Sequence, residues 1–166
     1  MKPLSLLGTD GNALRTAFDD TDQAMKKVGN NCGNLMFQYA VRNIINEKTL
    51  LVGKEIPWDP NIVKQNCRAL IIPSANFIRE NFDFSPVIEY ICKLKIPTLF
   101  IGLGASSVTP EQKDFNYHKS IYDLFDILKD KEITKIISIR DDNTASILEL
   151  NGITNYGNYR MSDKSN

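Results

Sequence analysis

The amino-acid sequence predicts a single Rossmann-like α/β domain of three layers, built on a mostly parallel β-sheet. Short apolar segments alternate along the chain with amphipathic segments of helical spacing, which is the pattern of strands joined by crossover helices. The apolar segments show little polar alternation, so both faces of each strand should be covered. Together these observations indicate the doubly wound class of α/β proteins.

The first clear helix is expected at residues 34–45. Apolar side chains recur there at three- and four-residue spacing and should form its buried face: Leu35, Met36, Tyr39, Ala40 and Ile44. The next apolar segment, residues 49–53, is either a strand or a loop. Residues 1–28 have loose apolar spacing and form an N-terminal segment of uncertain structure.

A buried strand at residues 69–72 is ended by Pro73. Ser85 then serves as N-cap of a helix, with Pro86 at its first helical position. Pro97 ends that helix, and the segment "TLFIGLGAS" forms a second buried strand.

A further helix is expected at residues 113–130, and the segment "KIISIR" forms a third buried strand. The helix after it begins with the acidic pair of "DDNTASILEL" and stops at Gly152. The Rossmann-like domain is therefore placed at residues 29–155, with a polar tail at residues 156–166. One face of the helix at 113–130 should carry Phe115, His118, Tyr122 and Phe125.

The composition favours a cytoplasmic protein. Lys plus Arg and Asp plus Glu are balanced at 20 each, which argues against a nucleic-acid or membrane-surface partner. The three cysteines are widely spaced, so we expect reduced thiols rather than disulfides or a metal site. The apolar patch in "MKPLSLLGTD" is too short for a signal peptide, and no segment is long enough to span a membrane.

Polar clusters should meet at the carboxyl edge of the sheet, where α/β domains bind ligands. Glycine lets backbone amides approach a ligand, a helix N-terminus favours anions, and arginine binds phosphate or carboxylate. The alternatives are capping by the asparagines, a tight turn at "GLGAS", and an ion pair between Arg140 and Asp141. The clusters are Asn30 to Asn34; Ser74, Ala75 and Asn76; Gly102, Gly104, Ser106 and Ser107; and Arg140, Asp141 and Asp142.

Other reactive residue types are weaker candidates. His118 is the single histidine, and we expect a packed or surface residue rather than a catalyst. Cys32 lies near a helix start, where a thiolate is stabilised, but without a partner base it is expected to be a small buried side chain. No nucleophile elbow or metal-ligand spacing is present in the sequence.

Four segments resemble, in order and spacing, the N-terminal half of the polysaccharide pyruvyl transferase family. They are "NNCGNLMFQYAVRNII", "ALIIPSANFI", "IPTLFIGLGASS" and "IISIRDDNTASILELNGITN". The resemblance implies one half of a GT-B-type fold and transfer of pyruvyl from phosphoenolpyruvate to a pair of sugar hydroxyls. It implies no resident cofactor, a sugar or lipid-linked saccharide as acceptor, and a role in surface polysaccharide synthesis. The general acid is not identified.

Carried over residue by residue, the family motifs place the substrate-binding positions in four loops. Family members continue with a second domain that binds the donor, whereas this chain continues with "NYGNYRMSDKSN". We therefore expect a truncation near residue 156, and a missing C-terminal domain or a homo-oligomer as partner. The substrate-binding positions implied by the resemblance are Asn31, Gly33, Asn34, Ser74, Asn76, Gly102, Gly104, Ala105, Arg140 and Asp141.

Two alternative functions remain open from the sequence. One is half of a GT-B-like glycosyltransferase that uses a nucleotide sugar. The other is a non-catalytic, truncated binding domain with an exposed apolar patch.

Overall fold

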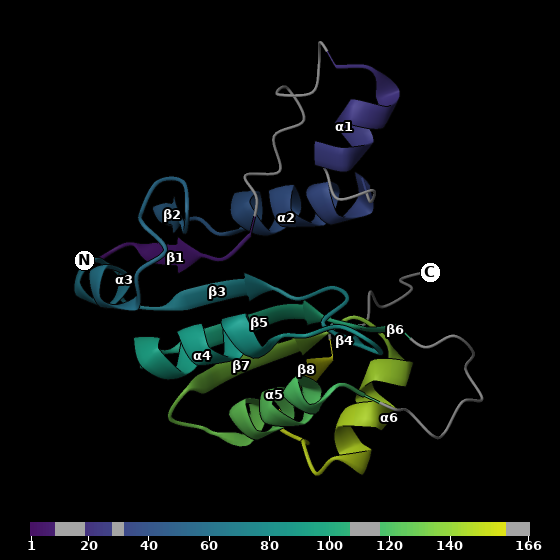
Figure 1. Cartoon of the computed structure of the whole chain (residues 1–166). Coiled ribbons are helices and arrows are strands. Elements are labelled where there is room, and N and C mark those ends of the chain that lie inside the picture. The colour runs from purple at the N-terminus through teal and green to yellow at the C-terminus, as the bar shows by residue number, and fades with distance from the viewer. Residues whose placement is uncertain (9–18, 28–31, 107–116, 159–166) are drawn as a thin grey trace, which may run out of the picture.

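A computed structural model describes residues 1–8, 19–27, 32–106 and 117–158, without the side chains of residues 24, 27, 32, 34 and 158. Its centre is a six-stranded sheet in the order β2-β1-β3-β5-β7-β8, in which every pair of neighbours is parallel (Figure 1). The prediction of a Rossmann-like α/β domain with a mostly parallel sheet is confirmed. The strands are β1 (Leu4–Leu6), β2 (Thr49–Leu51), β3 (Leu70–Pro73), β5 (Thr98–Leu103), β7 (Thr134–Ile139) and β8 (Gly157–Asn158).

Helices cover the sheet from both sides. Apolar side chains of α3, α4, α5 and α6 join one large core on one face, and α2 packs over β1, β2 and β3 on the other through a smaller core. A small parallel pair, β4 (Ile78–Arg79) and β6 (Ala105–Ser106), lies beyond the carboxyl ends of β3 and β5. The helices are α1 (Thr21–Lys27), α2 (Cys32–Ile44), α3 (Pro60–Asn66), α4 (Ser85–Leu94), α5 (Lys119–Lys129) and α6 (Asp142–Leu150).

The strand order reverses direction between β1 and β3. From β1 the chain adds β2 on one side, and from β3 it adds β5, β7 and β8 on the other. At such a switch point the connections after the two strands leave on opposite faces, and the crevice between them is where open α/β sheets bind ligands. Here the crevice lies between α2 and the loop that follows β3.

The buried face of α2 differs from the prediction. Met36 and Ile44 are 74% and 81% exposed, whereas Val41 is only 5% exposed and Phe37 packs beside it. The face with Met36 and Ile44 and the face with Phe37 and Val41 are both apolar at helical spacing, so periodicity alone does not show which of them is buried. The face with Val41 and Phe37 is buried because it packs on the apolar side chains of β1, β2 and β3.

The expectation that both faces of the sheet are covered holds only in part. On the α2 side, Ile136 of β7 is 48% exposed, and Leu99 and Ile101 of β5 are partly buried. The 13-residue α2 lies over β1, β2 and β3 and does not reach across β7. The opposite face is closed, since Phe100 and Ile137 are 0% and 2% exposed.

Two helix starts also differ from the prediction. Helix α4 begins at Ser85 with Phe84 as the cap residue, and the Asp83 carboxylate accepts from the Ser85 N–H at 2.8 Å. Helix α5 begins at Lys119, so His118 is its N-cap rather than part of a helical face. Phe115 lies outside the described residues. The start of α6 after Asp141 and the turn at Gly152, with φ +75°, agree with the prediction.

The outer segments both contribute to the sheet. Within residues 1–28, β1 pairs with β2 and β3, and in the tail β8 pairs with β7. The division of the chain at residues 29 and 155 itself stays a prediction. In the described ranges, no helix has the length and apolar character needed to cross a bilayer.

Candidate functional site

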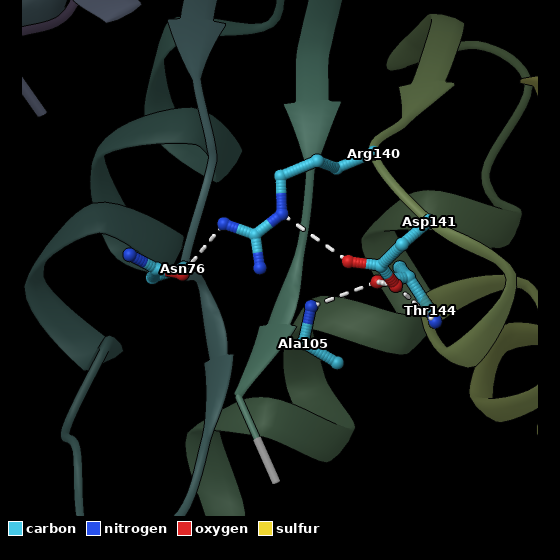
Figure 2. Close-up of polar contacts among 5 residues, drawn as sticks. All are labelled: Asn76, Ala105, Arg140, Asp141 and Thr144. Carbon is cyan, nitrogen blue, oxygen red and sulfur yellow. Dashed lines mark hydrogen bonds and ion pairs between the residues drawn. The ribbon is translucent and has the colours of Figure 1, made fainter. Parts of the chain in front are cut away.

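Arg140 and Asn76 meet at the carboxyl edge of the sheet, as their positions after β7 and β3 predict. The Arg140 Nη1 donates to the Asn76 Oδ1 at 3.1 Å, and its Nε donates to the Asp141 Oδ2 at 3.2 Å (Figure 2). The two side chains of the ion pair are 47% and 36% exposed. The ion pair that was the alternative interpretation of Arg140 is therefore present, and the guanidinium ties the β3 loop to the start of α6.

Asp141 connects Arg140 to α6 and, through Thr144, to β6. Its Oδ1 accepts from the Thr144 N–H at 2.8 Å and from the Thr144 hydroxyl at 2.7 Å, which is an N-cap of α6. The buried Thr144 Oγ1 in turn accepts from the Ala105 N–H at 2.9 Å (Figure 2). Burial opposes ionisation of Asp141, but the hydrogen bonds from Thr144 and Arg140 outweigh it and hold the pKa of Asp141 below its ordinary value.

The two glycines of "GLG" are needed for close packing. A Cβ on Gly104 would lie 2.0 Å from the Ala75 carbonyl oxygen, and the Gly104 N–H donates to the Ser74 carbonyl at 3.2 Å. Gly102 has φ +63°, and a Cβ there would lie 2.5 Å from the Phe37 Cζ. These glycines let the β3 loop and α2 approach β5, which is sufficient reason for both residues.

Of the other predicted substrate-binding positions, some have a packing role and some lie outside the described part of the chain. Ser74 is buried and its hydroxyl donates to the Ile101 carbonyl at 3.2 Å. Asn31 lies outside the described residues, Gly33 is exposed in the first turn of α2, and the Asn34 side chain is not described. The structure thus unites three of the four clusters, and ligand binding by these positions stays a prediction.

A pocket of about 140 Å³ lies at the switch point of the sheet. Its walls come from α2, from the end of β3 and from the segment that runs through β4 to the start of α4. Asn76 belongs to this wall, so the Arg140 corner and the pocket share a side chain. In Figure 2 the Asn76 amide nitrogen lies on the side away from the Arg140 guanidinium. The lining residues are Phe37, Gln38, Pro73, Ala75, Asn76, Phe77, Arg79, Phe82 and Phe84.

Arg79 is the cation of this pocket, and the sequence analysis missed it. Its Nε is buried and has no hydrogen-bond partner among the described residues. Its Cζ lies 3.7 Å from the centroid of the Phe82 ring, a cation–π contact, and burial lowers its pKa. The segment "NFIRENFDF" indicates such a site in the sequence, because phenylalanines surround one arginine between a strand and a helix.

His118, Asp83 and Ser120 come together without forming a catalytic triad. The His118 Nδ1 lies 2.9 Å from the Ser120 Oγ and 3.6 Å from the Asp83 Oδ1, so both partners meet the same ring nitrogen, whereas a triad uses both nitrogens. The Ser120 Oγ is buried and accepts from the Phe84 N–H at 2.8 Å. The cluster caps the N-termini of α4 and α5 and has no exposed nucleophile.

The described cysteines are free thiols. Cys67 is 2% exposed, and burial raises the pKa of its thiol, whereas Cys92 is exposed on α4. Within the described part of the chain, no group of three or more histidine, cysteine or carboxylate side chains is arranged to hold a metal ion.

Fold and site together define a doubly wound α/β domain with a small aromatic pocket at its switch point, lined by an arginine whose Nε has no hydrogen-bond partner in the described ranges. The chain is similar to Metacaspase-1 of Plasmodium berghei (strain Anka), with 28% identity over an alignment of 144 positions, which covers 80% of this chain and 22% of that protein. The chain therefore spans about a fifth of the length of this curated relative. No family model matches the chain, and no solved structure matches it.

These comparisons correct the functional interpretation made from the sequence. The resemblance to polysaccharide pyruvyl transferases is not supported, because no family model matches and a curated protein similar to the chain is a metacaspase, a caspase-like protease. The pyruvyl transferase function and its role in polysaccharide synthesis are therefore wrong, and neither alternative is favoured. The residues behind the resemblance are common fold elements: a helix start, two packing glycines and an N-capped helix. The phosphoenolpyruvate donor and the saccharide acceptor remain untested predictions from the sequence.

Proposed function

We propose that this chain binds a small organic carboxylate in the pocket between α2 and the loop after β3, with Arg79 as the cation that recognises it. The observation that carries the proposal is that Arg79 is the one charged residue among those that line the pocket, and its Nε–H finds no acceptor in the described part of the chain. An arginine is effectively always protonated, so the pocket wall carries a positive charge.

The energetics favour an anion over a neutral ligand. Leaving a buried donor unsatisfied costs about 1–3 kcal/mol, and a hydrogen bond to a charged partner contributes about 1.5–3 kcal/mol. A carboxylate in the pocket pairs with the charge of the Arg79 guanidinium. A neutral amide or alcohol leaves that charge without a counter-ion, so it should bind more weakly.

Arg140 and Asp141 hold Asn76, a residue of the pocket wall, in position. Arg140 holds the Asn76 Oδ1 at 3.1 Å, and Asp141 holds Arg140 at 3.2 Å. With its oxygen engaged in this way, Asn76 has its amide N–H groups left to donate to a ligand. We therefore assign Arg140 and Asp141 a positioning role and Asn76 a role in binding.

The test is a titration of the purified chain with small carboxylates and their neutral amides, followed by ligand-observed NMR. The variant is Arg79→Met, and the matched control is Arg68→Met. Arg68 also has a buried Nε without a partner in the described ranges, but it forms an ion pair with Glu47 and lies outside the pocket. A thermal melt of each variant shows that it is folded.

We expect the carboxylates to bind the wild type and the Arg68→Met variant alike, and the amides to bind weakly. Arg79→Met should weaken carboxylate binding about tenfold or more, in line with the loss of a charged hydrogen bond. Equal binding to the two variants, or binding that does not distinguish carboxylates from amides, rejects the proposal.

A cysteine-dependent protease is the second candidate, favoured by the similarity to a metacaspase. Such an enzyme needs a thiolate activated by a base, and the buried Cys67 with its raised pKa does not fit that role. Cys32, which opens α2, is the cysteine to test, because a helix N-terminus favours a thiolate. Hydrolysis of a fluorogenic peptide mixture that disappears in Cys32→Ala supports this function, and hydrolysis that is absent or unchanged in the variant rejects it.

A cytoplasmic location goes with the proposal. The free thiols of Cys67 and Cys92 support a reducing compartment.

A further inference from the structure

The residues that line the pocket also restrict the shape of the ligand. Phe82 and Phe84 have ring centroids 4.4 Å apart at 55°, and Phe77 and Phe84 have centroids 4.8 Å apart at 35°. All three rings, together with Phe37, line the pocket. An aromatic wall therefore lies beside the Arg79 guanidinium.

The size of the pocket limits what can stand against that wall. Its volume of about 140 Å³ is close to that of a cavity of roughly 150 Å³ lined by apolar residues, which holds benzene. A single six-membered ring fills this volume. Phe84 is 4% exposed, whereas Phe82 is 38% exposed, so Phe82 is the ring that a ligand would shield from water.

From these observations we infer that the ligand is an aromatic carboxylate with one ring, of about the size of benzoate. The carboxylate pairs with the Arg79 guanidinium, and the ring packs against Phe82 and Phe77. This inference rests on the proposed function and adds the ring to it. Offset and edge-to-face contacts between aromatic rings contribute beyond their buried area, and this makes a flat ring preferable to an aliphatic one of equal size.

The experiment compares benzoate, cyclohexanecarboxylate and acetate by ligand-observed NMR on the purified chain. Ligands of this size bind with Kd on the order of a millimolar, which the method detects. Benzoate should bind about tenfold or more tightly than acetate, because its ring leaves water. It should bind about 2- to 10-fold more tightly than cyclohexanecarboxylate, because the aliphatic ring lacks aromatic geometry.

Variants locate the effect in the wall. Phe77→Leu keeps an apolar side chain but removes the ring, and it leaves the contact between Arg79 and Phe82 in place. Tyr39→Leu is its matched control, since Tyr39 is 57% exposed on α2 and outside the pocket. Phe77→Leu should weaken benzoate binding several-fold and leave acetate unchanged, and Tyr39→Leu should alter neither. If benzoate binds no more tightly than acetate or cyclohexanecarboxylate, or if Phe77→Leu weakens benzoate and acetate to the same degree, the inference is overturned while the proposed function stands. If no carboxylate binds, both fall.

Discussion

Gly104→Ala should cost the domain much of its stability. The new Cβ would lie 2.0 Å from the Ala75 carbonyl oxygen and 2.9 Å from its carbon, and both are backbone atoms that no side-chain rotation can move. The loop after β3 must therefore shift away from β5. Overpacking of this kind costs about 1–3 kcal/mol.

The same shift threatens two backbone hydrogen bonds. The Gly104 N–H donates to the Ser74 carbonyl at 3.2 Å, and the Ile78 N–H donates to the Gly104 carbonyl at 3.1 Å. At about 1 kcal/mol each, their loss brings the expected total to about 3–5 kcal/mol. A domain of this size has roughly 5–15 kcal/mol in all, so the variant should fold but unfold much earlier.

Urea denaturation followed by circular dichroism measures this difference. The matched control is Gly53→Ala, because Gly53 has φ +83° but nothing within 4 Å of its Cβ position, so that variant carries backbone strain of about 1–2 kcal/mol without a clash. If Gly104→Ala loses no more stability than Gly53→Ala, the clash with the Ala75 carbonyl does not destabilise the domain. The displaced loop carries Asn76, so carboxylate binding should weaken as well.

Three further predictions follow from single contacts. Asp141→Ala should lower the free energy of unfolding by about 0.5–2 kcal/mol, because an N-cap is lost. The pKa of Asp141 is lowered in the folded state. The stabilisation by its carboxylate is therefore complete above the unfolded pKa of about 3.9 and is lost as the pH falls through the folded pKa. The gap between variant and wild type in urea melts should therefore narrow in acid, and a gap that widens contradicts this. Val41→Ala should lower the free energy of unfolding by about 1–2 kcal/mol and Met36→Ala by less than about 0.5 kcal/mol, because Val41 is 5% exposed and Met36 is 74% exposed. Equal losses in urea melts would indicate that the face of α2 with Met36 is buried, as expected from the sequence. Thiol labelling with peptide mapping should modify the exposed Cys92 at once and the buried Cys67 only on unfolding, and early labelling of Cys67 would show that it is not buried.

The parts of the fold that sequence predicts well are those decided by local chemistry. The strand that ends before Gly104 and the helix that begins after Asp141 carry their own signals, a long apolar run and an N-cap. By contrast β1 has only three residues, too few for any periodicity, and it is recognised only when β2 and β3 pair with it.

The parts that sequence predicts poorly are those decided by tertiary packing. The inward face of α2 depends on which of two apolar stripes meets the sheet, and His118 caps α5 because Ser120 and Asp83 lie beside it. The aromatic pocket exists only because α2 brings Phe37 to a loop some forty residues further along the chain. The polar residues at the edge of the sheet do lie beside the pocket, but Arg140 is hydrogen-bonded to Asn76 and Asp141, whereas the Arg79 Nε has no hydrogen-bond partner among the described residues.

The Arg79 Nε–H signal in a ¹H–¹⁵N NMR spectrum, followed as benzoate is added, shows whether Arg79 binds a carboxylate. Arg68 serves as the control within the same spectrum, since its Nε is also buried without a partner in the described ranges. If a carboxylate pairs with the Arg79 guanidinium, the Arg79 signal moves downfield and saturates while the Arg68 signal stays in place. If the Arg79 signal does not move, or if both signals move together, Arg79 is not the cation of a carboxylate site.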